Sequence, residues 1–250
     1  SSGWAESVGE TLDQIDPKET VEIACQKALT GQLPKEIPPG KYTVVMAPSA
    51  VAGLLSYLFY SMDAKAADEG RSAFSEREGR KIGTDQVQIY SQPQHPACPA
   101  SPFFNNGIPT ADVYWIRQGI LENLAYSRYW AQHTGHAYTG SPTNFIMDGT
   151  DVSLNALIAS VDQGLLITRF WYIRFVDPMK LLLTGMTRDG LFWIKNGAIQ
   201  YGVKNLRFNE SPLNVINNIE MFGKSKRVHG SSYVPSLKVR DFTFTSGTSF

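Results

Sequence analysis

An Asn-Gly pair set between two runs of strand-forming residues is the feature that most limits how this chain folds. Residues 191–194 precede the turn sequence Lys195-Asn196-Gly197, and residues 199–208 follow it. Asparagine and glycine accept the positive φ angles that a tight hairpin turn requires, so the two runs are predicted to pair as antiparallel strands. The apolar residues of the second run change parity, and an extra residue near Lys204-Asn205 is therefore expected to form a β-bulge.

A second apolar stretch, residues 164–176, is rich in leucine, isoleucine and aromatic residues on both alternating faces. This pattern is typical of a strand buried on two sides, so we expect one central strand of a sheet. Further strands are predicted at residues 41–46, in a hairpin at residues 112–121, and at residues 235–245, where apolar and charged side chains alternate.

Capping residues mark the predicted helices. Asp16 and Pro17 open a helix that should run to about Thr30, and Ser49 opens a longer one, residues 50–67, with an apolar stripe facing the core. Shorter helices are expected at residues 123–132 and 211–218, and a further one, capped by Asp151 or Ser153, should run to about Val161. Together the elements predict an α+β, β-rich fold in which helices cover a largely antiparallel mixed sheet or barrel-like domain.

Composition and charge exclude several partners. The 250 residues include 23 basic and 23 acidic side chains, so no net field would concentrate nucleic acid or an anionic membrane on the chain. No apolar run approaches the length needed to cross a bilayer, and the first residues lack an export signal. Cys25 and Cys98 are far apart and in no metal-binding spacing, which favours a reducing compartment, and we expect a cytoplasmic protein.

Three segments carry a resemblance to a known family: residues 40–55, 164–175 and 183–210. They resemble the TldD/PmbA family, historically called modulators of DNA gyrase and better described as paired subunits of a cytosolic zinc metallopeptidase. The resemblance implies that residues 1–40 form an N-terminal helix and linker and that residues 41–250 correspond to the family's C-terminal domain. The family's N-terminal α/β domain is expected to be missing from this chain.

Catalytic members of that family carry a His-Glu-x-x-x-His motif on the helix that follows the strand matching residues 41–46, where two imidazoles hold zinc and the glutamate is the general base. The corresponding residues 54–63 contain neither His nor Glu, and no Cys follows residue 223 as a third ligand. The resemblance therefore implies a non-catalytic, PmbA/TldE-like subunit with no catalytic residue and no metal of its own. The expected assembly is a homo-dimer, or a hetero-dimer with a TldD-type subunit, whose chamber binds peptide substrate; zinc is expected only in a catalytic partner.

Six side chains are weak or alternative site candidates, and a seventh, His229, is a candidate for a substrate contact. His133 and His136 have ligand-like spacing, but two imidazoles bind zinc poorly without a carboxylate or thiolate. Buried guanidinium groups need acidic or carbonyl partners, so the remaining candidates either form ion pairs that fix sheet register or grip the carbonyl or carboxylate groups of a peptide. These residues are Arg169, Arg174, Arg188 and Asp189.

Two other functions stay open at this point. One is a peptidase or other hydrolase with a relocated active site, built on His133 and His136 or on His229. The other is a structural homo-oligomer without a peptide role, in which the apolar strands supply a subunit interface.

Overall fold

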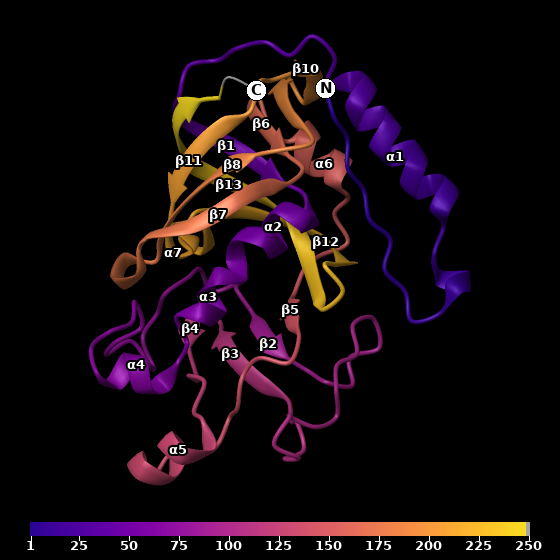
Figure 1. The fold of residues 1–250 in the computed structure, drawn as a ribbon. Helices are drawn as coiled ribbons and strands as arrows, with labels where there is room; N and C mark the ends of the chain where they lie inside the picture. Colours follow the sequence, from indigo (N-terminus) through magenta and orange to yellow (C-terminus); the bar gives the residue numbers. More distant parts are fainter. Residues whose placement is uncertain (249–250) are drawn as a thin grey trace.

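The computed structural model describes residues 1–248 and contains one 13-stranded mixed sheet with helices packed on it (Figure 1). Most neighbouring strands are antiparallel, while β1 pairs with β6 and β13 with β5 in parallel. The path from β10 to β4 is open, so the predicted α+β, β-rich fold is confirmed as an open sheet and not as a closed barrel. The strands are β1 (Gly40–Met46), β2 (Ile89–Ser91), β3 (Val113–Arg117), β4 (Ile120–Leu121), β5 (Phe145–Met147), β6 (Gln163–Ile167), β7 (Phe170–Asp177), β8 (Leu182–Thr187), β9 (Leu191–Lys195), β10 (Ala198–Gly202), β11 (Leu206–Glu210), β12 (Ile219–Val228) and β13 (Ser232–Gly247).

Three of the predicted helix starts are confirmed by their caps. Asp16, Ser153 and Ser211 accept hydrogen bonds from backbone amides in the first turns of α1, α6 and α7. The helix expected from residue 123 begins at Arg128 instead, because Ser127 is its cap. The helices are α1 (Pro17–Thr30), α2 (Pro48–Leu55), α3 (Tyr57–Tyr60), α4 (Ala64–Asp68), α5 (Arg128–Thr134), α6 (Leu154–Ala159) and α7 (Pro212–Asn217), with 3-10 turns at Leu12–Gln14 and Pro178–Lys180.

The single long helix predicted over residues 50–67 is wrong. The chain forms α2, α3 and α4 in succession. The predicted Ser49 cap is also wrong, because α2 begins at Pro48 after Ala47 and has no side-chain cap. Asp63 accepts a hydrogen bond from the Ala66 amide at 2.7 Å and so starts α4 as a new helix. The apolar stripe itself is correct, since Leu54, Leu58 and Met62 are all fully buried. Periodicity identified the buried side chains but not the bends between the helical turns.

The Asn-Gly hairpin is confirmed. β9 and β10 are antiparallel, and Asn196 and Gly197 have φ angles of 51° and 74°. The expected bulge near Lys204-Asn205 is wrong, because β10 ends at Gly202 and the chain starts a new strand, β11, that pairs with β8 and β13. The change of apolar parity therefore marks the point where the chain leaves β10 and enters a different part of the sheet as β11.

The predicted central strand over residues 164–176 is correct only in its first half. β6 lies between β1 and β9 and is buried along most of its length. The chain then turns, and β7 is an edge strand that pairs with β8 and leaves Trp171, Tyr172 and Phe175 exposed. An edge strand and a central strand can have the same sequence pattern, because a strand's position in the sheet depends on partners that are distant in the sequence.

The two faces of the sheet pack separate clusters of apolar side chains. Val44 and Met46 of β1 belong to the main core, whereas Val45 between them belongs to a smaller cluster covered by α6. β13, the predicted closing strand, is confirmed and is longer than expected, with partners β1, β5, β11 and β12. The largest fully buried side chains include Trp115, Phe74, Phe208, Phe242 and Met46.

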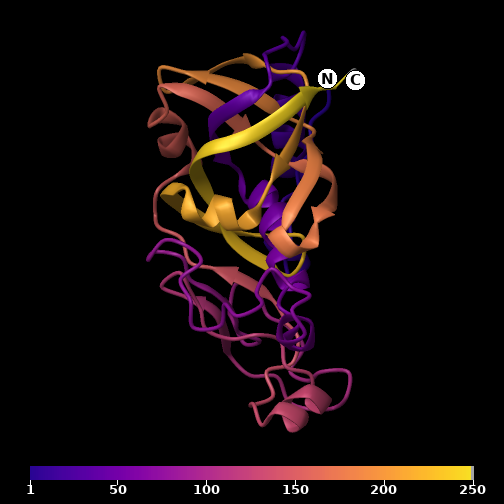
Figure 2. The same cartoon turned by 90° about the vertical axis from the view of Figure 1, so that its left-hand side faces the viewer.

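α1 stands outside both clusters, and none of its residues is buried. Figure 1 shows it beside the sheet, with the extended first residues of the chain running between them. In the turned view both ends of the chain lie at one end of the molecule, and α5 lies at the other (Figure 2). Among residues 1–248, no helix combines the length and apolarity that crossing a bilayer requires.

Candidate functional site

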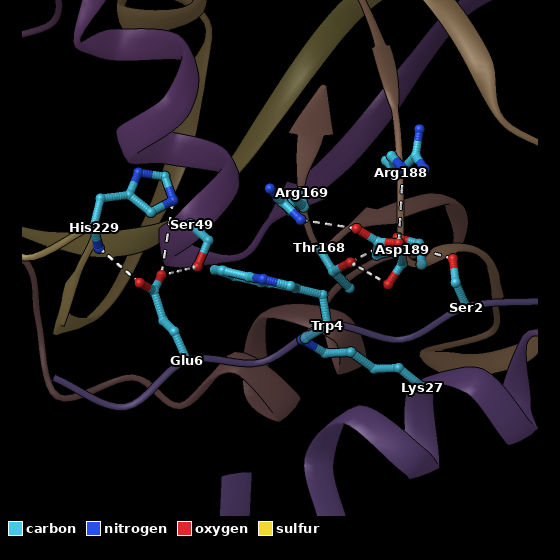
Figure 3. Close-up of polar contacts among 11 residues, drawn as sticks. Ser2, Trp4, Glu6, Lys27, Ser49, Thr168, Arg169, Arg188, Asp189 and His229 are labelled. Carbon is cyan, nitrogen blue, oxygen red and sulfur yellow. Dashed lines mark hydrogen bonds and ion pairs between the residues drawn. The ribbon is translucent and has the colours of Figure 1, made fainter. Parts of the chain in front are cut away.

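Three of the predicted site residues meet where the β6–β7 and β8–β9 connections lie side by side (Figure 3). Arg169 Nη1 lies 2.9 Å from Asp189 Oδ2, and Arg188 Nε lies 3.9 Å from Asp189 Oδ1. The Thr168 hydroxyl lies 3.1 and 3.0 Å from the carbonyl oxygens of Asp189 and Gly190 and ties the two connections together. Because only 12% of the Asp189 side chain is exposed, its pairing with Arg169 is partly shielded from water.

The remaining arginine lies elsewhere. Arg174 is on the exposed edge strand β7, and its guanidinium lies 4.5 Å from the centre of the Tyr172 ring. Arg174 therefore contacts an aromatic ring of its own strand and forms no ion pair with Asp189.

His133 and His136 lie at α5, at the end of the molecule opposite the first residues (Figures 1 and 2). His136 stacks on Tyr126 with ring centres 4.5 Å apart, and His133 stacks on Tyr129 at 6.0 Å. Both imidazoles are thus held by aromatic rings, without an acid or thiolate to complete a ligand set.

His229 lies in the β12–β13 turn, and its ring lies close to Gly53 in α2. Its φ is 51°, and a Cβ added at Gly53 would lie 3.9 Å from its Cε1 atom. The ring meets Trp4 edge-on, with ring centres 6.3 Å apart. The substrate-contact candidate thus lies on the same side of the molecule as Arg169 and Asp189 (Figure 3).

What joins these residues is the N-terminal segment, residues 1–10, which sequence reasoning overlooked. The segment is extended and lies along the sheet side of α1 (Figures 1 and 3). Ser2 Oγ donates to Asp189 Oδ1 at 2.8 Å, and the Arg169 guanidinium lies 4.4 Å from the centre of the Trp4 ring. The signal that could have found it is the alternation Ser2-x-Trp4-x-Glu6, the period of an extended chain with one face in contact.

Glu6 makes the densest set of contacts. Its carboxylate accepts from the His229 backbone amide at 2.8 Å and from the Ser49 hydroxyl at 3.0 Å, and lies 3.7 Å from His229 Nε2. Further along, Glu10 pairs with Arg227, which also donates to the Gly230 carbonyl at 2.8 Å. We refer to the surface formed by Lys27, Ser49, Arg169, Asp189, Arg227 and His229 as the docking groove.

A cavity of about 390 Å³ lies beneath Trp4, between α1 and the sheet, with Ile23, Leu166 and Phe192 among its apolar walls. Lys27 reaches from α1 into this region and donates to the Trp4 carbonyl at 2.7 Å. Burial lowers the pKa of Lys27, and the nearby charge of Lys226 lowers it further. The groove therefore combines an apolar floor with cationic groups along its rim.

The residues that correspond to the zinc-binding helix do not fit a metal. Leu54, Leu55, Leu58 and Met62 are fully buried in the main core. The leucine side chains have no lone pair to donate to zinc, and the thioether of Met62 is not among the nitrogen, thiolate and carboxylate ligands that zinc takes in proteins. Across the described residues there is no group of three or more His, Cys, Asp or Glu side chains arranged to hold a metal ion. We therefore derive no metal-dependent step for this chain.

Comparisons with known proteins found relatives of this chain. A family described as PmbA/TldA metallopeptidase C-terminal domain matches residues 39–246. The metalloprotease PmbA of Escherichia coli O157:H7 is 23% identical, over 94% of this chain and 54% of its own length, so the chain spans about half the length of this relative.

Two solved structures share the fold. A protein described as a modulator of a DNA gyrase from Thermotoga maritima superposes with a TM-score of 0.87 and 23% identity, over 95% of this chain and 57% of the other. TldE from Thermococcus kodakarensis superposes with a TM-score of 0.82 and 18% identity, over 91% and 55% of the two chains.

Proposed function

Because this chain belongs to the PmbA/TldD metallopeptidase family, we propose that it is a non-catalytic subunit of a cytosolic peptidase assembly of that type, which holds extended peptide while a zinc-bearing partner cleaves it. The non-catalytic part of this proposal is supported by the buried helices after β1. Family hydrolysis needs imidazole and carboxylate groups there, and this chain uses the positions for its core.

The single observation that carries the peptide-holding role is the docked N-terminal segment. An extended stretch of polypeptide lies in the docking groove and is fixed by the side chains of Asp189, Arg169 and Ser49 and by the backbone amide of His229. A groove that fits one extended segment has the dimensions and the polar groups to fit another.

The cytosolic location is supported by cysteine chemistry. Cys25 and Cys98 are both free thiols, which is the usual state in a reducing compartment. The partner is supported by the family alone: we propose a subunit that carries the His-Glu-x-x-x-His motif.

The test is metal analysis of the purified chain together with a peptidase assay with and without a chelator. We expect less than stoichiometric zinc and no chelator-sensitive cleavage from the chain alone, and cleavage when a motif-bearing family member is added. Stoichiometric zinc together with chelator-sensitive cleavage by the chain alone would overturn the proposal.

A further inference from the structure

We propose that the docking groove recognises extended peptides with an aromatic residue two positions before an acidic residue, and that the N-terminal segment occupies it as an intramolecular ligand. The inference rests on the proposed function, because it assigns a peptide class to the same surface. It adds a regulatory consequence: peptides from outside must displace the segment.

The segment contacts the groove through residues of one parity. Ser2, Trp4 and Glu6 each reach a groove side chain, and Glu10 keeps the same parity. Alternate residues of an extended chain point to the same side, so one face of the segment is turned toward the groove. A peptide with the same spacing would present the same groups.

Each side chain of the segment is chemically complementary to the groove group that it contacts. The Trp4 ring lies under the Arg169 guanidinium and edge-on to His229, which suits an aromatic side chain. The Glu6 carboxylate receives a backbone amide and a hydroxyl, and Glu10 meets Arg227, which suits two acids four residues apart. The groove's own acid, Asp189, takes a hydroxyl donor at the first position.

The backbone of the segment contributes little to its attachment. Within the described part of the chain, residues 1–10 form no strand and no backbone-to-backbone hydrogen bond with the groove. The Trp4 carbonyl is taken by the Lys27 side chain. Apart from this carbonyl, the segment is fixed through its own side chains, so its attachment depends mainly on its sequence and leaves it exchangeable.

A steric limit sharpens the peptide class. A Cβ added at Gly3 would lie 1.9 Å from the Ala24 carbonyl oxygen on α1. The position just before the aromatic residue must therefore be glycine while α1 keeps its place. The recognised pattern becomes a hydroxyl residue, glycine, an aromatic residue, any residue, and an acid.

Occupancy by the segment has a measurable consequence. A tethered ligand competes at a high effective concentration, so the apparent affinity for a free peptide equals the intrinsic affinity multiplied by the fraction of grooves left open. Weakening the tethered contacts should restore the affinity for the free peptide.

The experiment uses a fluorescein-labelled peptide with the sequence of residues 1–11 and the 250-residue chain, with binding followed by fluorescence polarisation. The comparison is between the unmodified chain and an open variant, Trp4→Ala/Glu6→Gln, whose groove residues are unchanged. We expect the open variant to bind the peptide at least about tenfold more tightly than the unmodified chain.

Matched controls separate recognition from adhesion. Peptides with Trp4→Ala, Glu6→Gln or Gly3→Ala should bind the open variant at least about tenfold more weakly than the original peptide. Adding Ser49→Ala to the open variant should weaken the original peptide but change the Glu6→Gln peptide little, since the lost hydroxyl contact needs that carboxylate. Size-exclusion chromatography and thermal unfolding confirm that each variant is folded.

Failure of this peptide-recognition inference can be told apart from failure of the proposed function. Equal binding of the original and a scrambled peptide, or no binding to a folded open variant, would overturn this inference while leaving the zinc and peptidase results untouched. Zinc with chelator-sensitive cleavage would overturn the proposed function whatever the polarisation shows.

Discussion

At the scale of single residues, Asp189 links the segment to the sheet. It accepts from Ser2, pairs with Arg169 and adopts a φ of 57°, a conformation that aspartate and asparagine tolerate better than most residues. Its side chain is largely shielded, so its contacts are worth more than those of a surface pair.

Asp189→Ala should therefore lower the free energy of unfolding by about 2 kcal/mol, because it leaves the Arg169 charge unpaired and forces alanine into positive φ. Asp189→Asn, which keeps the backbone conformation and a hydrogen-bond acceptor, should cost about 1 kcal/mol. Urea unfolding followed by tryptophan fluorescence measures both.

The matched control is Glu22→Ala, which breaks the exposed Lys18–Glu22 pair. That change should stay within about 0.5 kcal/mol. Equal losses for Asp189→Ala and Glu22→Ala would show that Asp189 contributes no more to the free energy of unfolding than an exposed ion pair does.

His95 gives the stability a defined pH dependence. Burial lowers the pKa of His95 from its ordinary value of 6.5, only partly offset by Asp148, and its Nδ1 accepts from the Ala97 amide at 3.3 Å. The unfolded chain then binds the proton first as pH falls. The contribution of neutral His95 is complete above pH 6.5 and is lost as pH falls through the window from 6.5 to the lower folded value.

Urea midpoints measured from pH 7.5 to 5.5 should fall more steeply for the unmodified chain than for His95→Gln, which cannot take up the proton. Since the other histidines are common to both chains, the difference isolates His95. Parallel midpoint curves for the two chains would contradict the expectation.

At the scale of elements, the β9–β10 turn illustrates how local geometry and tertiary packing combine. Gly197 has a φ of 74°, and an added Cβ would lie 2.7 Å from the Ala159 carbonyl oxygen at the end of α6. Gly230 in the β12–β13 turn has a φ of 76° but no atom within 4 Å of its added Cβ. The two glycines share a backbone requirement and differ in their surroundings.

Gly230→Ala should cost about 1 kcal/mol, the conformational penalty alone. Gly197→Ala should cost at least about 1 kcal/mol more, because the methyl group must push α6 away from the hairpin. Thermal and urea unfolding of the two variants provide the comparison, and equal costs would show that α6 does not press on the turn.

The same turn shows which features the sequence could disclose. Asn196-Gly197 and the caps at Asp16, Ser153 and Ser211 were predictable because each acts on residues close by in sequence. The exposure of β7 was not, because it depends on the absence, among residues 1–248, of a strand paired with β7 on its side away from β8, and a strand's edge position is set by the whole sheet.

Some residues of the candidate site could be predicted from the sequence, and others were missed for the same reason. Arg169 and Asp189 could be singled out because charges in apolar strands need partners. The partners Trp4 and Glu6 were missed, because they come from a segment without helical periodicity that lies more than 160 residues from Arg169.

At the scale of the whole molecule, the chain separates into a well-packed sheet and a loosely attached flank. The sheet buries both faces of β1, whereas α1 buries none of its residues and meets the sheet across the N-terminal segment and a cavity. Peripheral elements with few buried contacts open at lower free energy than the core. A groove whose outer wall can open is suited to exchange an occupant, as the proposed function requires.

The central claim is that this chain holds extended peptide without cutting it. It is tested most directly by mass spectrometry of the residue 1–11 peptide after incubation with the purified open variant and added zinc. We expect the peptide to be recovered intact from the protein-bound fraction. Recovery of peptide fragments whose formation a chelator prevents would contradict it.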